Sequence, residues 1–386
     1  MKFLYHLSRI ILGITFIFSG FAKGSDPWGS AFKFNDYFQV MGLSWWAWSA
    51  FAFAVLLAFT EFAIGACILF QVKIKFFAWL GLIFMVFFTG LTFWIAIANP
   101  VTDCGCFGDA LVISNWQTFY KNLVLITLAF IIFKYRKTEK PLLNLKLNYG
   151  LGFLVMAVYI GSVFYSYNHL PLFDFRPYKV GVNIPDAMSY PENAEQDVYE
   201  NIFLYKNKTT GKVKEFTEKN YPWQDTANWE YSDSESILIS EGYKPPIHDL
   251  TFQTREGVDV IDFFIHDENY VFILVSYDLS KANTNSQDKI NELSNWATEN
   301  GNTFIGLTSS LFEDCDAYAD MTGAQFEFFN CDEITLKTIV RSNPGLIVIK
   351  DGTIKGKWHY NDIPTPEEFI AECKKEKKIA PVSPLK

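Results

Sequence analysis

Basic residues are scarce in the second half of this 386-residue sequence. Residues 170–386 hold 36 acidic and 21 basic residues, a net charge of −15, whereas residues 1–169 hold 6 and 12, a net charge of +6. Binding to nucleic-acid phosphates requires lysine and arginine gathered on one face, so this balance argues against nucleic acid as a partner. The length leaves room for two or three domains.

Two further absences argue against a transporter and against a cleaved secretory signal. The hydrophobic segments show no internal repeat of the kind that transporters favour, so a transporter is the least favoured class. The first of these segments lacks a small-x-small cleavage site behind it. We therefore expect it to remain as a membrane anchor rather than to be removed as a secretory signal.

Half of the residues are hydrophobic and 18% are aromatic, and this apolar surplus is concentrated in the first half. A segment of about 20 apolar residues can cross a hydrocarbon core of ~30 Å. The sequence therefore predicts a membrane part followed by a soluble domain, with five spanning helices at residues 3–21, 45–70, 76–98, 116–133 and 149–167.

The basic residues in the short loops predict the orientation of these helices. They gather in the second loop and in the fourth, whereas the third loop, residues 99–115, has no lysine or arginine. We expect a cytoplasmic N-terminus, with the third loop and everything after Tyr167 outside. In a bacterium this describes a multi-pass protein of the cytoplasmic (inner) membrane whose C-terminal domain is periplasmic, where disulfides persist. The basic residues of the two loops are Lys73, Lys75, Lys134, Arg136, Lys137, Lys140 and Lys146.

The third loop contains the stretch DCGCFGD at residues 103–109. Gly105 lacks a Cβ and can bend the backbone between Cys104 and Cys106, which brings their sulfurs within reach of each other. A bridge across one residue is a small, strained ring, and strained exposed disulfides are the ones that exchange. The stretch predicts a redox-active dithiol/disulfide pair, with Cys104 and Cys106 as candidate catalytic residues.

Two other interpretations of this stretch stay open. It could be a tight polar turn whose cysteines have no redox role. A metal site made by the two cysteines with Asp103 and Asp109 is less favoured, because no histidine lies near and two thiolates alone rarely hold zinc. We therefore assign no metal ligand.

Two ionisable residues are placed unfavourably for a bilayer. Glu61 is about nine residues from the inner end of the second span, and Arg9 is about a turn and a half inside the first span from the same side. The similar depths predict an ion pair between them, which would be a functional feature of the membrane domain. The alternative is that Arg9 snorkels to the cytoplasmic surface while Glu61 is protonated. Lys121 and Asn122, which open the fourth span, are a further candidate pair.

Beyond the spans, residues 170–248 are punctuated by prolines and predict an extracytoplasmic β-rich linker region. Within it, residues 199–205 and 212–217 predict a β-hairpin. From residue 249 the pattern alternates between strands and helices. It predicts strands at 270–275, 303–308 and 326–329, helices at 286–300, 312–321 and 333–341, and a final hairpin around Asp351-Gly352 at 346–358.

Residues 1–137 resemble the DoxX superfamily and, more narrowly, its methylamine-utilisation branch, the MauE-like proteins. That resemblance implies a four-helix membrane unit linked to periplasmic disulfide formation; the fifth helix, with the cytoplasmic loop before it (residues 138–169), would tether the second domain. The family usually has Arg-Asn where this chain has Lys121-Asn122, which keeps the charge but loses a fork of donors. The residues that carry the resemblance are Arg9, SGFAK at 19–23, Glu61, CGCFG at 104–108 and Lys121-Asn122.

Residues 249–386 resemble a thioredoxin-type fold by the order of their elements and by Asn343-Pro344, where that fold keeps a cis-proline. Redox-active members carry Cys-x-x-Cys after the strand that here ends at Val275, but residues 276–281 read SYDLSK. The domain is therefore expected to be a docking module, with Pro344 and residues 277–280 forming a face that is open to a partner peptide. The other cysteines of this half are expected to be small buried residues.

The sequence favours a membrane protein that supports periplasmic thiol–disulfide exchange through Cys104 and Cys106. A periplasmic thiol protein would be the partner, and the resemblance implies a lipid-soluble electron acceptor such as a quinone. The alternative is a non-catalytic membrane scaffold whose degenerate thioredoxin-like domain binds an envelope partner. Whether the protein is an enzyme, and in which direction electrons flow, is left open by the sequence.

Overall fold

The structure is a computed structural model, and it describes the chain apart from residues 1, 102, 138–143, 241 and 380–386. Two compact units are present. One combines residues 1–182 with residues 249–386, and the other comprises residues 183–248. Lys140, which contributes to the predicted orientation, lies outside the described residues.

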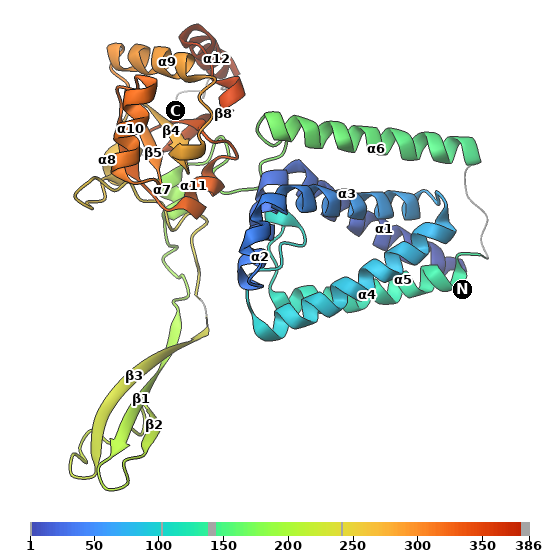
Figure 1. Cartoon of the computed structure of the whole chain (residues 1–386), viewed down its shortest axis with the longest axis horizontal. Coiled ribbons are helices and arrows are strands. Elements are labelled where there is room, and N and C mark those ends of the chain that lie inside the picture. Colours follow the sequence, from blue (N-terminus) through green and yellow to red (C-terminus); the bar gives the residue numbers. More distant parts are fainter. Residues whose placement is uncertain (1, 102, 138–143, 241, 380–386) are drawn as a thin grey trace, which may run out of the picture. The chain divides into compact units, whose positions relative to one another are not determined.

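Among the residues that the structure describes, five helices of the first unit are long and apolar enough to span a membrane, which confirms the five predicted spans. Helix α1 packs along α3, and α4 packs along α5 (Figure 1). Their outer faces carry exposed phenylalanines such as Phe130 and Phe153, a distribution that suits a lipid environment. The helices are α1 (Lys2–Ser25), α3 (Ala50–Leu69, preceded by the 3-10 turn Ser44–Ser49), α4 (Ile74–Ala98), α5 (Asn115–Tyr135) and α6 (Leu145–Asn168).

Glycines set the register of α1 against α3. A Cβ added to Gly20 would lie 2.6 Å from the backbone nitrogen of Phe62 and 2.7 Å from the carbonyl oxygen of Ala58. A Cβ on Gly65 would lie 2.7 Å from the backbone nitrogen of Ile17. Small residues allow membrane helices to approach this closely. The register brings the middle of α3, including Glu61, beside the C-terminal part of α1.

We expect Gly20→Ala to destabilise the helical bundle by about 1–3 kcal/mol, because the added methyl group overpacks a contact between two backbones. Thermal unfolding of the purified protein measures the effect. Gly90→Ala is the matched control, since a Cβ there meets nothing within 4 Å. It should be neutral or slightly stabilising, because alanine favours a helix more than glycine does. Equal effects of the two changes would contradict this account of the register.

Helix α2 (Pro27–Val40) was not predicted from the sequence. It begins with a proline at its first position, and the Asp26 carboxylate caps it by accepting a hydrogen bond from the Gly29 backbone nitrogen at 2.8 Å. The helix packs against α3 and carries Lys33 and Tyr37 toward the cysteine loop. The Asp-Pro start was a usable signal, but the segment is too short and too mixed in composition to read as a span.

The α/β part of this unit contains a five-stranded sheet in the order β6-β5-β4-β7-β8. Strands β4, β5 and β6 are parallel, and β7 is antiparallel to both β4 and β8. All of the strands and helices predicted here are present; helix α8 (Ile261–Ile265) was not predicted. The elements are β4 (Tyr270–Ser276), α9 (Gln287–Glu299), β5 (Thr303–Thr308), α10 (Phe312–Thr322), β6 (Glu327–Asn330), α11 (Glu333–Ile339), β7 (Gly345–Lys350), β8 (Thr353–His359) and α12 (Pro366–Ile379).

The second unit contains a three-stranded antiparallel sheet in the order β2-β1-β3 (Figure 1). Strands β1 (Val198–Asn207) and β2 (Val213–Thr217) confirm the predicted hairpin. Strand β3 (Trp229–Ser240) and the short helix α7 (Ile184–Met188) were not predicted. Strand β3 is exposed along nearly its whole length, so its sequence lacks the alternation of apolar and polar residues that marks a half-buried strand.

Candidate functional site

The cysteine loop folds as the sequence predicts. Gly105 has a φ of +65°, a region that glycine enters without strain, and its backbone nitrogen donates a hydrogen bond to Asp103 Oδ1 at 2.8 Å. The turn brings Cys104 Sγ to within 3.2 Å of Cys106 Sγ. Both cysteines are free thiols and are partly buried. A disulfide needs a sulfur–sulfur distance of about 2.05 Å, so a small movement of the loop would allow the bond to form.

Helix α2 supports one side of this loop. Lys33 Nζ lies 2.8 Å from Asp103 Oδ2, and the Tyr37 hydroxyl donates a hydrogen bond to the Cys104 carbonyl oxygen at 3.1 Å. These two contacts fix the part of the loop that carries Cys104. Sequence reasoning missed both because it did not place a helix at residues 27–40.

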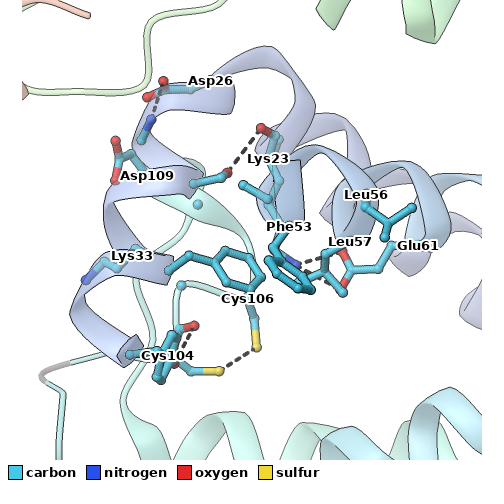
Figure 2. A pocket seen from close by; sticks show the side chains of 18 of the residues that line it. Lys23, Asp26, Lys33, Phe53, Leu56, Leu57, Glu61, Cys104, Cys106 and Asp109 are labelled. Atoms are coloured by element: carbon cyan, nitrogen blue, oxygen red, sulfur yellow. Dashed lines mark hydrogen bonds and ion pairs between the residues drawn. The ribbon is translucent and has the colours of Figure 1, made fainter. Parts of the chain in front are cut away.

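A buried polar network in the bundle supports the other side. The Ser19 hydroxyl lies 2.6 Å from the Cys106 carbonyl oxygen and 2.8 Å from Glu61 Oε2, and it accepts a hydrogen bond from Lys23 Nζ at 3.0 Å. Lys23 Nζ also lies 2.9 and 2.7 Å from the two carboxylate oxygens of Glu61 (Figure 2). The backbone of Cys106 is therefore tied through Ser19 to a buried ion pair.

The predicted pair between Arg9 and Glu61 is wrong, because Glu61 pairs with Lys23. Arg9 lies about 14 residues before Lys23, roughly 21 Å along α1. The Arg9 guanidinium instead lies 5.9 Å from the centre of the Tyr5 ring. Depth counted from the helix ends gave the wrong partner for two reasons. Helix α1 continues to Ser25, which keeps Lys23 inside the bundle, and the glycine contacts set the register of α1 against α3.

Lys121 and Asn122 take different roles. Lys121 Nζ lies 4.2 Å from the centre of the Phe107 ring, a cation–π contact with the residue that follows Cys106. The Asn122 side chain donates a hydrogen bond to Thr92 Oγ1 at 3.1 Å, which joins α5 to α4. Lys121 thus belongs to the surroundings of the thiols, whereas Asn122 fixes the helices behind them.

The two thiols have opposite electrostatic tendencies. The hydrogen bond from the Cys104 thiol lowers the pKa of Cys106, and the positive charges of Lys121 and Lys23 act in the same direction against the effect of burial. The same hydrogen bond raises the pKa of Cys104, and burial adds to this rise. The pair is therefore set up with Cys106 as the thiolate and Cys104 as the thiol that donates to it.

An apolar cavity of about 460 Å³ adjoins the thiols and was not predicted from the sequence. Cys104, Cys106, Lys23 and Glu61 all line it (Figure 2). Most of the remaining wall is aromatic or aliphatic and comes from α2, α3 and α4. These wall residues are Phe34, Phe38, Phe53, Leu56, Leu57, Phe84, Phe87, Phe88 and Leu91.

In the α/β part the Asn343–Pro344 bond is cis, as predicted. The face expected to be open beside Pro344 is only partly so. Ser280 is exposed, but Tyr277 is half-buried and packs edge-on against Phe32 of α2, with the ring centres 6.1 Å apart. The face is covered on this side because an aromatic side chain of the bundle reaches it. Cys315 and Cys331 are buried, as expected, and Cys373 is half-buried.

Comparison with known proteins supports the resemblance predicted for the membrane part of the chain. Residues 1–135 match the family model described as methylamine utilisation protein MauE. This part of the chain is therefore similar to MauE, and five helices among the residues that the structure describes are long and apolar enough to cross a membrane, which indicates a multi-pass membrane protein. Residues 199–241, which contain most of the three-stranded sheet, match a domain of unknown function (DUF8463).

One solved structure shows a distant likeness to this chain. A solution structure of a candidate protein disulfide isomerase from Bacteroides thetaiotaomicron is similar at 14% identity, over 34% of this chain and 84% of that one, with a TM-score of 0.26. At that TM-score the likeness carries no argument about this chain. A search of curated proteins found no match.

Proposed function

We propose that this MauE-like protein carries out thiol–disulfide exchange through Cys104 and Cys106, from the cytoplasmic membrane and with the thiols facing the periplasm. The observation that carries the proposal is the pair of sulfurs 3.2 Å apart at the wall of an apolar cavity. The surrounding cations support one thiolate, which is the reactive form in exchange. The absence of lysine and arginine from the loop supports the outward orientation.

A thiolate of the periplasmic partner attacks Cys104 Sγ of the oxidised pair, the Cys104–Cys106 bond breaks, and Cys106 leaves as a thiolate. The second partner thiolate attacks the mixed disulfide, so the partner is oxidised and Cys104 is released reduced. A lower thiol pKa makes a better leaving group, and Cys106 is the thiol with the lowered pKa. Opposite pKa tendencies thus support different roles for the two cysteines.

The reduced pair must then give two electrons and two protons to an acceptor. The adjoining cavity supports a lipid-soluble quinone as this second substrate, because its aromatic and aliphatic wall suits a flat apolar ring. The quinone would be reduced to the hydroquinone as the Cys104–Cys106 bond forms again. Lys23 and Glu61 form a buried ion pair at the cavity wall, so they would contact the bound quinone with their polar ends.

A trapping experiment tests the exchange. In the reverse direction of this exchange Cys104 attacks the partner's disulfide, and Cys106 then releases Cys104 from the mixed disulfide. Cys106→Ser removes that second step, so a mixed disulfide between Cys104 and a periplasmic protein should accumulate. The adduct is read on non-reducing gels after acid quenching. Cys104→Ser is the matched control and should trap much less. Adding Cys373→Ser to the Cys106→Ser variant should leave the adduct intact. If alkylation finds Cys104 and Cys106 free under every condition and no adduct forms, the exchange proposal fails.

A non-catalytic scaffold is the second candidate. One observation favours it: the turn after β4 has no cysteine, so the α/β part lacks a dithiol of its own at that position. The strand order β6-β5-β4-β7-β8 supports a thioredoxin-like ancestry for residues 249–386, and the motif residues support a place for residues 1–137 in the wider DoxX superfamily. In this account the α/β part would bind an envelope protein whatever the state of the thiols.

A further inference from the structure

One arginine of the α/β part reaches the cysteine loop. Arg341 follows helix α11 and is 7% exposed. Its Nε lies 2.8 Å from Asp26 Oδ2, and its Nη2 lies 2.9 Å from Asp109 Oδ2. A planar guanidinium holds two carboxylates in a fixed geometry, which a lysine cannot do.

Both carboxylates lie in segments that hold the dithiol in place. Asp26 caps helix α2, the helix whose Lys33 and Tyr37 contact the loop around Cys104. Asp109 closes the stretch DCGCFGD, three residues after Cys106. A single side chain of the α/β part therefore connects the N-terminal end of α2 with the end of the cysteine loop (Figure 2 shows Asp26 and Asp109).

We propose that Arg341 is a positioning residue for the dithiol: through Arg341 the α/β part docks on the cysteine loop and holds Cys106 in its cationic surroundings. The docking surface is built around Phe32 of α2. Arg341 Cζ lies 5.4 Å and Lys337 Nζ 4.7 Å from the centre of the Phe32 ring, and Tyr277 packs against its edge. These contacts with the Phe32 ring add cation–π and aromatic packing to the ion pairs of Arg341.

The two carboxylates bind Arg341 unequally. Burial opposes the charge of Asp26, but the attraction of Arg341 and Arg176 lowers its pKa below the ordinary value. Burial raises the pKa of Asp109, and repulsion by Asp26 adds to the rise against the attraction of Arg341. Asp26 is therefore the firm anchor of the arginine, and Asp109 on the cysteine loop is the contact that is released more easily.

Arg341 would thus act as a positioning residue at the site of the proposed function, and this role rests on that function only for the use made of the thiols. Its test therefore reads the thiols directly. The purified full chain in detergent is treated with iodoacetamide over a range of pH, and the alkylation of Cys106 is followed by mass spectrometry. The midpoint of the pH profile reports how strongly the surroundings favour the Cys106 thiolate.

We expect Arg341→Gln and Asp109→Asn each to move this midpoint upward by about one pH unit, which corresponds to about a tenfold smaller thiolate fraction at a pH well below the midpoint. The reason is that a released loop takes Cys106 away from Lys121 and Lys23. Arg255→Gln is the matched control. It removes an arginine that pairs with Asp316 on the exposed surface of the same part, and it should leave the midpoint unchanged.

An unchanged midpoint in both variants overturns the inference, even if alkylation becomes faster, because Arg341 would then merely cover the thiols. If Arg341→Gln does not fold, Asp109→Asn decides alone, since it keeps the pair between Arg341 and Asp26. Arg341→Lys should recover part of the shift. Failure of the proposed function is seen separately, as the absence of a mixed disulfide in the trapping experiment.

Discussion

Replacement of Lys23 by methionine is expected to destabilise the MauE-like domain by about 3–5 kcal/mol, because it leaves the carboxylate of Glu61 buried without its counter-charge. The side chains of Lys23 and Glu61 are only 10% and 8% exposed, so water cannot replace the lost partner. Ser19 alone could not compensate, since its hydroxyl also serves the Cys106 carbonyl oxygen. Thermal unfolding of the purified protein measures the loss.

A double-mutant cycle separates this ion pair from general damage. Glu61→Leu alone should also destabilise, whereas Lys23→Met combined with Glu61→Leu should recover much of the loss, because breaking one side of a buried pair costs more than removing both. Lys121→Met is the matched control: it removes a lysine of a spanning helix that contacts an aromatic ring rather than a carboxylate, and should cost less. Additive effects of Lys23→Met and Glu61→Leu would show that the two residues are not coupled.

Lys23 also shows where prediction from sequence reaches its limit. Hydropathy located all five spans, but it ended the first one near Phe21, before the lysine, because a charged residue lowers the apolar average. In the folded bundle the same lysine stays inside α1, since Glu61 and Ser19 satisfy its ammonium group. A rule that counts charge against a span cannot foresee a partner on another helix.

For the other parts of the site, the distance in sequence between the contributing residues decides whether the feature could be predicted. Gly105 bends the chain within three residues, so the approach of Cys104 to Cys106 could be predicted. The cavity is lined by residues of α1, α3 and α4 and of the unpredicted α2, and no local sequence pattern describes it. The contact of Arg341 with Asp26 joins residues 315 positions apart. Only the folded chain can reveal such a contact.

Alkylation at neutral pH is expected to modify Cys106 much faster than Cys104, because a thiolate reacts and a thiol does not. The pKa of Cys106 is lowered from an ordinary value of 9.0, so its thiolate is present well below pH 9 and is lost as the pH falls through the lowered value. The pKa of Cys104 is raised, so its reaction should remain slow up to alkaline pH. Mass spectrometry after brief treatment with iodoacetamide distinguishes the two sites.

Substitution of Cys104 by alanine tests the cause. The hydrogen bond from the Cys104 thiol is the largest influence that lowers the pKa of Cys106, so Cys104→Ala should raise this pKa. The alkylation profile of Cys106 should move to higher pH, and at a pH well below the midpoint each unit of the shift slows alkylation by about tenfold. Lys121→Gln should produce a smaller shift in the same direction. Cys373→Ser, in the α/β part, should have no effect. Two outcomes would contradict the unequal pair and the assignment of Cys106 as the leaving group. One is the same alkylation midpoint pH for both thiols, and the other is an alkylation profile of Cys106 that Cys104→Ala leaves unchanged.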